Sequence, residues 1–231
     1  MNFAPAGKRK SETPKALAMT NPWANQLKRS RCKRVPPTSG RAKETFDGIL
    51  LAAGELLGEI GFERLSTNDI CASAGITPPA LYHYFYDKYD ILEELALRLL
   101  KAQNDAFYVW VFAGGFVGSA QERQDKLADW YRQAAQVTAS HPGALAILRA
   151  MHALPDLAPL RLASQRMLTD SICDIYHRLN PQEDKRLLWY RLRISCEFGF
   201  MVDELALEED RIDNEFLFRE VAAMLSAPAS G

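Results

Sequence analysis

Residues 66–85 read STNDICASAGITPPALYHYF, and this stretch decides the interpretation of the whole chain. Ser66 stands three residues before Asp69, a spacing typical of the start of a helix. Gly75 supplies the left-handed backbone conformation that ends a helix. Thr77 can cap a second helix, because the two prolines that follow need no N–H in the first turn. The stretch therefore predicts two short helices joined by a tight turn.

The second of these helices has one buried side and one open side. Leu81 and Phe85 lie four residues apart and share the face that packs inward. Pro79 and His83 then point outward. The helix carries no acidic residue, so its outer side suits a groove lined with phosphates. Two helices arranged in this way form a helix-turn-helix, whose second helix enters the major groove of DNA.

Apolar residues recur at helical spacing on both sides of this stretch. A preceding helix is expected from Arg41 to Ile60, with Gly61 ending it. The remaining expected helices are 87–112, 119–140, 144–153, 156–179, 182–208 and 210–225. No segment alternates as a strand does, so we predict an all-α protein of about nine helices.

The stretch from Arg41 to about Leu99 resembles the TetR family of transcriptional regulators. The motifs that carry the resemblance are Gly61-Phe62, Ser66-Thr67-Asn68-Asp69-Ile70, Ala74-Gly75-Ile76-Thr77, Leu81-Tyr82-His83-Tyr84-Phe85 and Asp87-Lys88. The resemblance implies an N-terminal three-helix DNA-binding domain and a C-terminal helical domain for ligand binding and dimerisation. The expected segments are an arm over 1–40, the two domains over 41–87 and 88–226, and a tail over 227–231.

The same resemblance implies which residues contact DNA. Residues at the starts of helices, including Lys88, contact phosphates, and residues on the outer side of the second motif helix contact bases. The implied residues are Ser66, Thr67, Asn68, Thr77, Pro78, Pro79, Ala80, Tyr82, His83, Tyr84 and Lys88. His83 can donate to N7 or O6 of a purine. Tyr84 lies close to the buried face, so a place in the core is an equal alternative for it.

Charge is distributed unevenly along the 231 residues, although the net charge is only −1. Residues 1–45 hold 11 basic and 2 acidic side chains, and residues 46–231 hold 17 and 27. Within 46–90, two basic side chains stand against seven acidic ones, a net charge of −5. Phosphate neutralisation supplies most non-specific affinity for DNA, so we expect a flexible basic arm over 1–40 to supply it, with an inert arm as the alternative. The expected phosphate contacts are Arg41, Lys43 and residues 28–34.

Beyond residue 100 the chain offers two apolar surfaces. The middle helices are expected to enclose a small hydrophobic or aromatic ligand, lined by Phe107, Trp110, Tyr131, Arg149, Met151, His152, Met167, Cys173 and Tyr176. Arg149 and His152 would be polar anchors for an anionic ligand. The last two helices are expected to form a four-helix dimer interface through Leu188, Leu192, Ser195, Gly199, Val202, Phe216, Val221 and Met224. Packing within one chain is the alternative for both sets.

Several classes of protein find no support in the sequence. No apolar segment reaches the roughly 18 residues of a membrane span, and no secretory signal is expected. The four cysteines form no CxxC pair, which argues against a disulfide scaffold and a cysteine zinc site and indicates a reducing cytoplasm. The histidines lack metal-ligand spacing and no catalytic motif is present, so we expect no metal, no cofactor and no enzyme activity.

Together these observations predict a cytoplasmic, ligand-responsive repressor. The protein would bind a palindromic double-stranded DNA operator as a homodimer, and a small hydrophobic or aromatic effector would release it. The alternative is a helical small-molecule-binding protein or enzyme in which the helix-turn-helix only packs.

Overall fold

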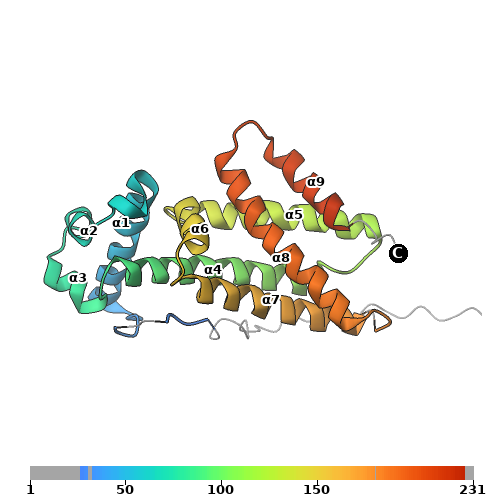
Figure 1. Ribbon diagram of the computed structural model, residues 1–231, viewed down its shortest axis with the longest axis horizontal. Coiled ribbons are helices and arrows are strands. Elements are labelled where there is room, and N and C mark those ends of the chain that lie inside the picture. The colour runs from blue at the N-terminus through green and yellow to red at the C-terminus, as the bar shows by residue number, and fades with distance from the viewer. Residues whose placement is uncertain (1–26, 31–32, 180, 227–231) are drawn as a thin grey trace, which may run out of the picture.

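The computed structural model describes residues 27–30, 33–179 and 181–226 (Figure 1). Its helices are α1 (Gly40–Arg64), α2 (Thr67–Ala74), α3 (Pro78–Tyr84), α4 (Lys88–Phe112), α5 (Ala120–Ala139), α6 (Ala144–Ala153), α7 (Ala158–Leu179), α8 (Lys185–Glu208) and α9 (Asn214–Ser226). Within the described residues every regular element is a helix, which confirms the all-α prediction. Most of the expected arm and the whole expected tail lie outside the described residues.

The helix boundaries follow the sequence closely except near the C-terminus. The predicted break at Gly61 is present as a φ of +75° inside α1. By contrast, α7, α8 and α9 begin two to four residues later than expected. Asp184 accepts a hydrogen bond from the Leu187 N–H at the start of α8, and Asp213 accepts one from the Phe216 N–H at the start of α9. Each aspartate lies two or three residues beyond the expected start of its helix, and its hydrogen bond sets the observed start.

The first three helices pack into a small domain around aromatic and aliphatic side chains. Ile70 of α2 and Leu81 of α3 are fully buried with the apolar side of α1. The Phe46 ring of α1 stacks on the Phe85 ring that follows α3, with centroids 4.9 Å apart. This is the buried face predicted from the spacing of Leu81 and Phe85, and it leaves the opposite side of α3 open.

A single long helix joins this domain to the rest of the molecule. α4 begins beside α3 and runs unbroken to Phe112; α5, α6 and α7 pack against it, and α8 and α9 pack on these helices (Figure 1). Phe107 and Trp110 of α4 form a second apolar cluster with Ile172 of α7. No helix among the described residues is both long enough and apolar enough to cross a membrane.

The two halves also touch where α1 passes the turn before α6. A Cβ atom placed on Gly54 would lie 2.7 Å from the carbonyl oxygen of Pro142. One placed on Gly143 would lie 2.3 Å from the carbonyl oxygen of Gly54, and Gly143 also has a φ of +72°. Side chains larger than hydrogen do not fit at either position. The His-Pro-Gly break therefore serves as a backbone contact between the domains.

We predict that Gly54→Ala lowers the free energy of unfolding by about 1–3 kcal/mol, because the added methyl group must displace the backbone of Pro142. The matched control is Gly48→Ala in the same helix, where a Cβ atom has no neighbour within 4 Å. Alanine's higher helix propensity should make that variant more stable by about 1 kcal/mol. Urea unfolding followed by circular dichroism measures both, and stabilisation by both substitutions would contradict the close contact.

Candidate DNA-binding surface and ligand cavity

The helix-turn-helix has the predicted caps and turn, apart from one side chain. Ser66 Oγ accepts a hydrogen bond from the Asp69 N–H at 3.2 Å, and Gly75 has a φ of +63° in the turn. Thr77 stands at the start of α3, but its side chain accepts no hydrogen bond from that helix, so the predicted side-chain cap is wrong. Pro79 has no N–H to donate, and the Ala80 N–H bonds to the backbone carbonyl of Thr77 instead.

Most residues assigned to DNA lie on the open side of α2 and α3. Asn68, Thr77, Pro78, Pro79, Tyr82 and His83 are exposed, and Ser66, Thr67 and Ala80 are half-buried. The hydroxyl groups of Thr67 and Tyr82 are 3.0 Å apart and form a hydrogen bond. This bond ties α3 to the start of α2 and presents both hydroxyl groups at one place on the surface.

Tyr84 and Lys88 have structural partners. The Tyr84 ring is half-buried and meets the Phe46 ring edge-on, with centroids 5.6 Å apart. The Lys88 ammonium donates to the carbonyl oxygens of Phe62, Glu63 and Leu65 at 3.0, 3.3 and 3.1 Å. All three of its protons are therefore used at the C-terminal end of α1. Lys88 thus closes a helix end that leaves carbonyls without helical partners, and its expected contact with a phosphate stays a prediction.

Arg29 corrects the expectation that the whole arm is flexible. Its guanidinium pairs with Asp90 at 2.9 Å and with Glu94 at 3.1 Å, and all three side chains are at most 6% exposed. Burial raises the pKa of the Asp90 carboxyl, and the charge of Arg29 opposes that rise. Buried carboxylates need a partner, so the first turns of α4 hold residues 27–30 in place. The sequence alone gave no sign of this pair, because its members are about 60 positions apart.

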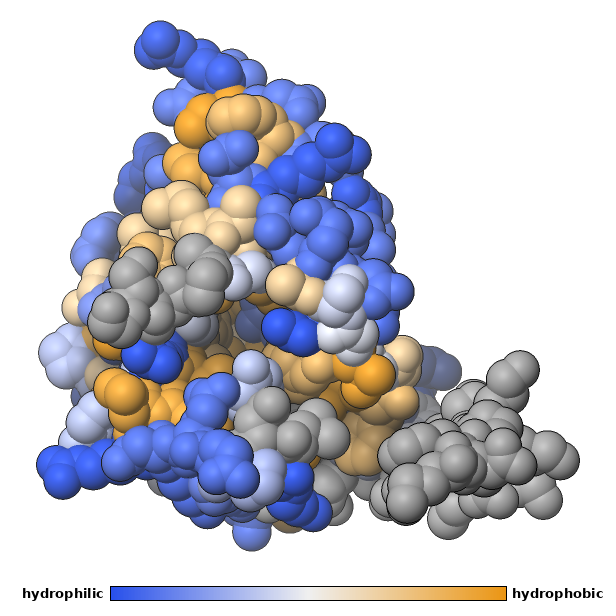
Figure 2. All heavy atoms as spheres, turned by 90° about the vertical axis from the view of Figure 1, so that its right-hand side faces the viewer, coloured by the Kyte–Doolittle hydropathy of each residue, from blue (hydrophilic) through white to orange (hydrophobic). Residues whose placement is uncertain are grey.

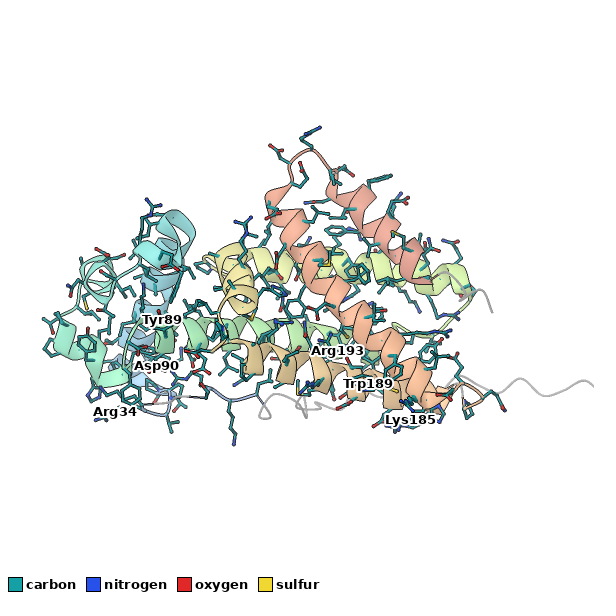
Figure 3. All side chains as sticks on the ribbon, in the orientation of Figure 1. Arg34, Tyr89, Asp90, Lys185, Trp189 and Arg193 are labelled. Carbon is teal, nitrogen blue, oxygen red and sulfur yellow. The ribbon has the colours of Figure 1, made fainter. Side chains whose placement is uncertain are left out.

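The docked segment brings further groups to the edge of α3. Leu27 is buried, and the Ser30 N–H donates to Glu93 Oε1 at 2.7 Å. Lys33 is exposed, donates to the backbone carbonyl of Tyr82, and lies 5.1 Å from the centre of the Tyr86 ring. Figure 3 shows Arg34 and Asp90 at this corner of the molecule. Positive charge from the arm is thus held next to the open side of α3.

The two cations expected on α1 differ in their surroundings. Arg41 is exposed in the first turn. Lys43 forms an ion pair with Asp47, which also pairs with Arg98 at 2.8 Å. The charge of Lys43 is therefore offset within the domain, whereas Lys33 stands closer to α3.

The helices after α3 enclose a cavity of about 560 Å³. Figure 2 shows it as a hollow with hydrophobic residues around it, on the end of the molecule away from α3. Its walls come from α4, α5, α7, α8 and α9. Four of the nine predicted residues line it: Phe107, Trp110, Tyr131 and Tyr176. The volume and the aromatic walls suit a small organic ligand.

The other five predicted lining residues lie elsewhere. Arg149 pairs with Glu208 on the surface, and His152 is exposed. Met151 and Cys173 are buried, and Met167 is half-buried against neighbouring apolar side chains. The three apolar residues lie on apolar helix faces, as predicted, but those faces pack against other helices and do not line the cavity. Arg149 and His152 therefore cannot hold an anionic ligand in the cavity, because neither side chain lines it.

Sequence reasoning missed a buried acidic residue that lines the cavity. Asp203 of α8 is 3% exposed, and its Oδ2 accepts hydrogen bonds from Gln103 and Thr138, both at 2.8 Å. Burial raises the pKa of the Asp203 carboxyl to about 6, although these two hydrogen bonds oppose the rise. The only sign of this group in the sequence is that Asp203 falls among the apolar residues of α8.

A row of polar contacts fixes the rotation of α8 about its own axis. Lys185, Trp189 and Arg193 follow one another at intervals of four residues along the helix (Figure 3). They bond to Asp174 at 2.8 Å, to Asp170 at 2.7 Å and to Gln165 at 2.6 Å, all on α7. The row holds one side of α8 against α7 and so determines which residues face solvent.

This rotation corrects the expected dimer surface. Leu188, Leu192, Ser195 and Gly199 line the cavity, and Val202 is buried. The exposed apolar residues of α8 are Leu187, Tyr190, Ile194, Phe198 and Met201, which we call the α8 stripe. At 100° per residue this stripe lies about 120° around the helix from the predicted set. On α9, Phe216 and Met224 are exposed as predicted, whereas Val221 is half-buried in an apolar cluster.

Sequence comparison connects the N-terminal part of the chain to known regulators. Residues 49–95 match a family model described as bacterial regulatory proteins, tetR family. The HTH-type transcriptional repressor BepR of Brucella suis is 38% identical over 68 residues, which are 29% of this chain and 32% of that protein. The HTH-type transcriptional regulator UidR of Escherichia coli is 39% identical over 57 residues, 25% of this chain and 29% of that protein. The matched stretches span about a third of these relatives.

Structure comparison extends the similarity to the whole fold. A TetR-family transcriptional regulator from Syntrophomonas wolfei superposes with a TM-score of 0.63, covering 80% of this chain and 94% of that chain. The two sequences are 18% identical, so the similarity concerns the fold: a helix-turn-helix domain followed by a helical domain. The relatives are transcriptional regulators and not enzymes, in agreement with the expectation from the sequence.

The raised pKa of Asp203 predicts a pH-dependent stability. An unfolded aspartate has a pKa of about 4, so the folded state binds the proton more tightly and loses stability as the pH rises through about 6. Relative to Asp203→Asn, the wild-type protein should lose about 2 kcal/mol between pH 4 and pH 7. Urea unfolding of both proteins at each pH measures this difference. Parallel pH profiles would contradict the buried carboxylate.

Proposed function

This chain belongs to the TetR family of bacterial regulatory proteins, and we propose that it is a cytoplasmic transcriptional repressor. In this proposal a homodimer binds a palindromic DNA operator, and a small hydrophobic effector in the cavity releases it. The observation that carries the proposal is the open side of α3, where exposed Pro79, Tyr82 and His83 project beside the cation of Lys33.

The surface around α3 has one set of side chains that can read bases and another that can bind phosphates. His83 and Tyr82 can reach base edges in the major groove, because both are exposed on a helix without acidic residues. The docked arm supplies Lys28 and Lys33, which are exposed and can contact phosphates. The arm thereby compensates the acidic character of residues 46–90, as the charge distribution predicts.

The α8 stripe supports assembly with a second copy of the chain. Ile194 and Met201 are each 58% exposed, and Leu187, Tyr190 and Phe198 extend the same face of the helix. An apolar row of this length on a soluble protein marks a protein interface. Pairing of α8, with Phe216 and Met224 of α9 contributing, gives a two-fold dimer that matches a palindromic operator.

Release by an effector follows from the position of the cavity. α4 contributes Gln103 to Trp110 to the cavity and carries the base of the DNA-binding domain at its other end. A ligand that binds one placement of α4 more tightly shifts the protein toward that placement, by an amount set by the difference in affinity. The distance between the two recognition helices changes with it. The alternative function is that of a helical small-molecule-binding protein without a DNA role. Such a protein would form no complex with any operator.

We predict that two substitutions separate base recognition from phosphate binding. His83→Ala should weaken binding to DNA from upstream of the protein's own gene about 5- to 100-fold at every salt concentration. Lys28→Ala combined with Lys33→Ala should instead flatten the salt dependence, lowering the slope of log K against log salt by about 0.9 for each phosphate that the arm no longer neutralises. Fluorescence anisotropy at several salt concentrations measures both.

The control for the arm variant removes two exposed cations, by Arg178→Ala with Arg211→Ala; they lie at the end of α7 and in the α8–α9 turn, and Figure 1 shows both of these segments far from α3. Its salt slope should equal that of the wild-type protein. An unchanged slope for the arm variant would show that the arm does not contact phosphates. No complex with the wild-type protein at low salt would eliminate the repressor proposal itself.

Ile194→Glu tests the dimer surface. A carboxylate buried in an apolar interface should raise the dissociation constant of the dimer on the order of 100-fold, whereas a surface position tolerates it. Val109→Glu is the matched control, because Val109 is 66% exposed on α4 and lies outside the α8 stripe. Sedimentation equilibrium measures assembly, and circular dichroism checks that both variants keep their helices. Equal assembly of the two variants would exclude the α8 stripe.

A further inference from the structure

The lining of the cavity includes two buried hydrogen-bond acceptors that have no donor among the described residues. Asp203 Oδ2 is fully used by Gln103 and Thr138, but Asp203 Oδ1 has no hydrogen-bond partner among the described residues. The same holds for Gln103 Oε1, whose amide nitrogen donates to Thr138 and Asp203. Both side chains line the cavity, and both oxygen atoms are buried. The protein thus presents acceptors, one of them on a carboxylate, where a ligand would end.

Unpaired buried acceptors favour one kind of ligand. Leaving such a group without a partner is unfavourable, and more so for a charged group, so a bound molecule gains most by donating there. A protonated amine can donate to both oxygen atoms at once and also supplies the charge that a buried carboxylate requires. A carboxylate or another acceptor at this position would leave the same oxygen atoms unpaired and add repulsion.

The walls and the rim of the cavity agree with this preference. Trp110, Trp130 and Phe107 line it, and aromatic faces attract organic cations. The basic residues that line the cavity, Arg123 and Arg191, are only partly buried or exposed, unlike Asp203. They therefore belong to the wider rim and do not neutralise the carboxylate.

We propose that the cavity binds a hydrophobic organic amine, whose ammonium group donates to Asp203 Oδ1 and Gln103 Oε1 while its apolar body lies among the tryptophans. The proposal rests on the assignment of the cavity as the effector site and adds the chemical class of the effector. It replaces the anionic ligand expected from Arg149 and His152, both of which lie outside the cavity.

Three probes with one apolar body and different head groups test the proposal: 4-phenylbutylamine, 4-phenylbutanol and 4-phenylbutyrate. Quenching of tryptophan fluorescence reports binding, because Trp110 and Trp130 line the cavity. The full-length wild-type protein should bind the amine at least about 10-fold more tightly than the butyrate, with the alcohol between them. Asp203→Asn should weaken binding of the amine by at least about 10-fold and retain the affinity for the alcohol.

The control variant is Asp210→Asn, which removes an exposed acid outside the cavity and should leave the affinity for the amine unchanged. Equal affinity for the amine and the butyrate, equal weakening in the two variants, or no binding of any probe would each overturn the proposal. Operator binding measured on the same samples keeps the two questions apart. A wild-type protein that binds its operator but shows no preference among head groups remains a repressor and lacks the proposed effector.

Discussion

The arrangement of the whole molecule depends on a place where two backbones touch without side chains between them. Gly54 of α1 meets Pro142 and Gly143 before α6, and any Cβ atom would separate them. A contact of this kind cannot absorb movement by changing side-chain rotamers, because there are none. The small DNA-binding domain is therefore held at two points, by this contact and by the unbroken α4. A shift of α6 or α4 would therefore displace α1, which packs against both helices.

Local features of the sequence predicted the local structure well. The cap at Ser66 and the left-handed turn at Gly75 are present as expected, because each involves residues only three or four positions apart. The same spacing rules identified the apolar faces of α3 and α4. Helix starts were predicted less closely before α8 and α9, where aspartates a few residues beyond the expected starts provide the caps.

Long-range partners could not be predicted in this way. The pairs of Arg29 with Asp90 and of Lys88 with the end of α1 depend on how the chain folds back. The rotation of α8 was missed for a similar reason. Both of its apolar stripes have helical periodicity, and the contacts of Lys185, Trp189 and Arg193 with α7 decide which one is covered. Asp203 was overlooked because a buried acid looks, in sequence, like a solvent-facing one.

The cavity opens at the end of the molecule opposite α3, with the length of α4 between them (Figures 1 and 2). Double-stranded DNA at α3 consequently leaves its mouth uncovered. In the proposed repressor, an effector could thus enter while the protein is bound to its operator and would not need to wait for spontaneous dissociation. Derepression would then proceed at a rate set by effector concentration and by the movement of α4. The lifetime of the undisturbed complex on DNA would not limit how quickly the cell responds.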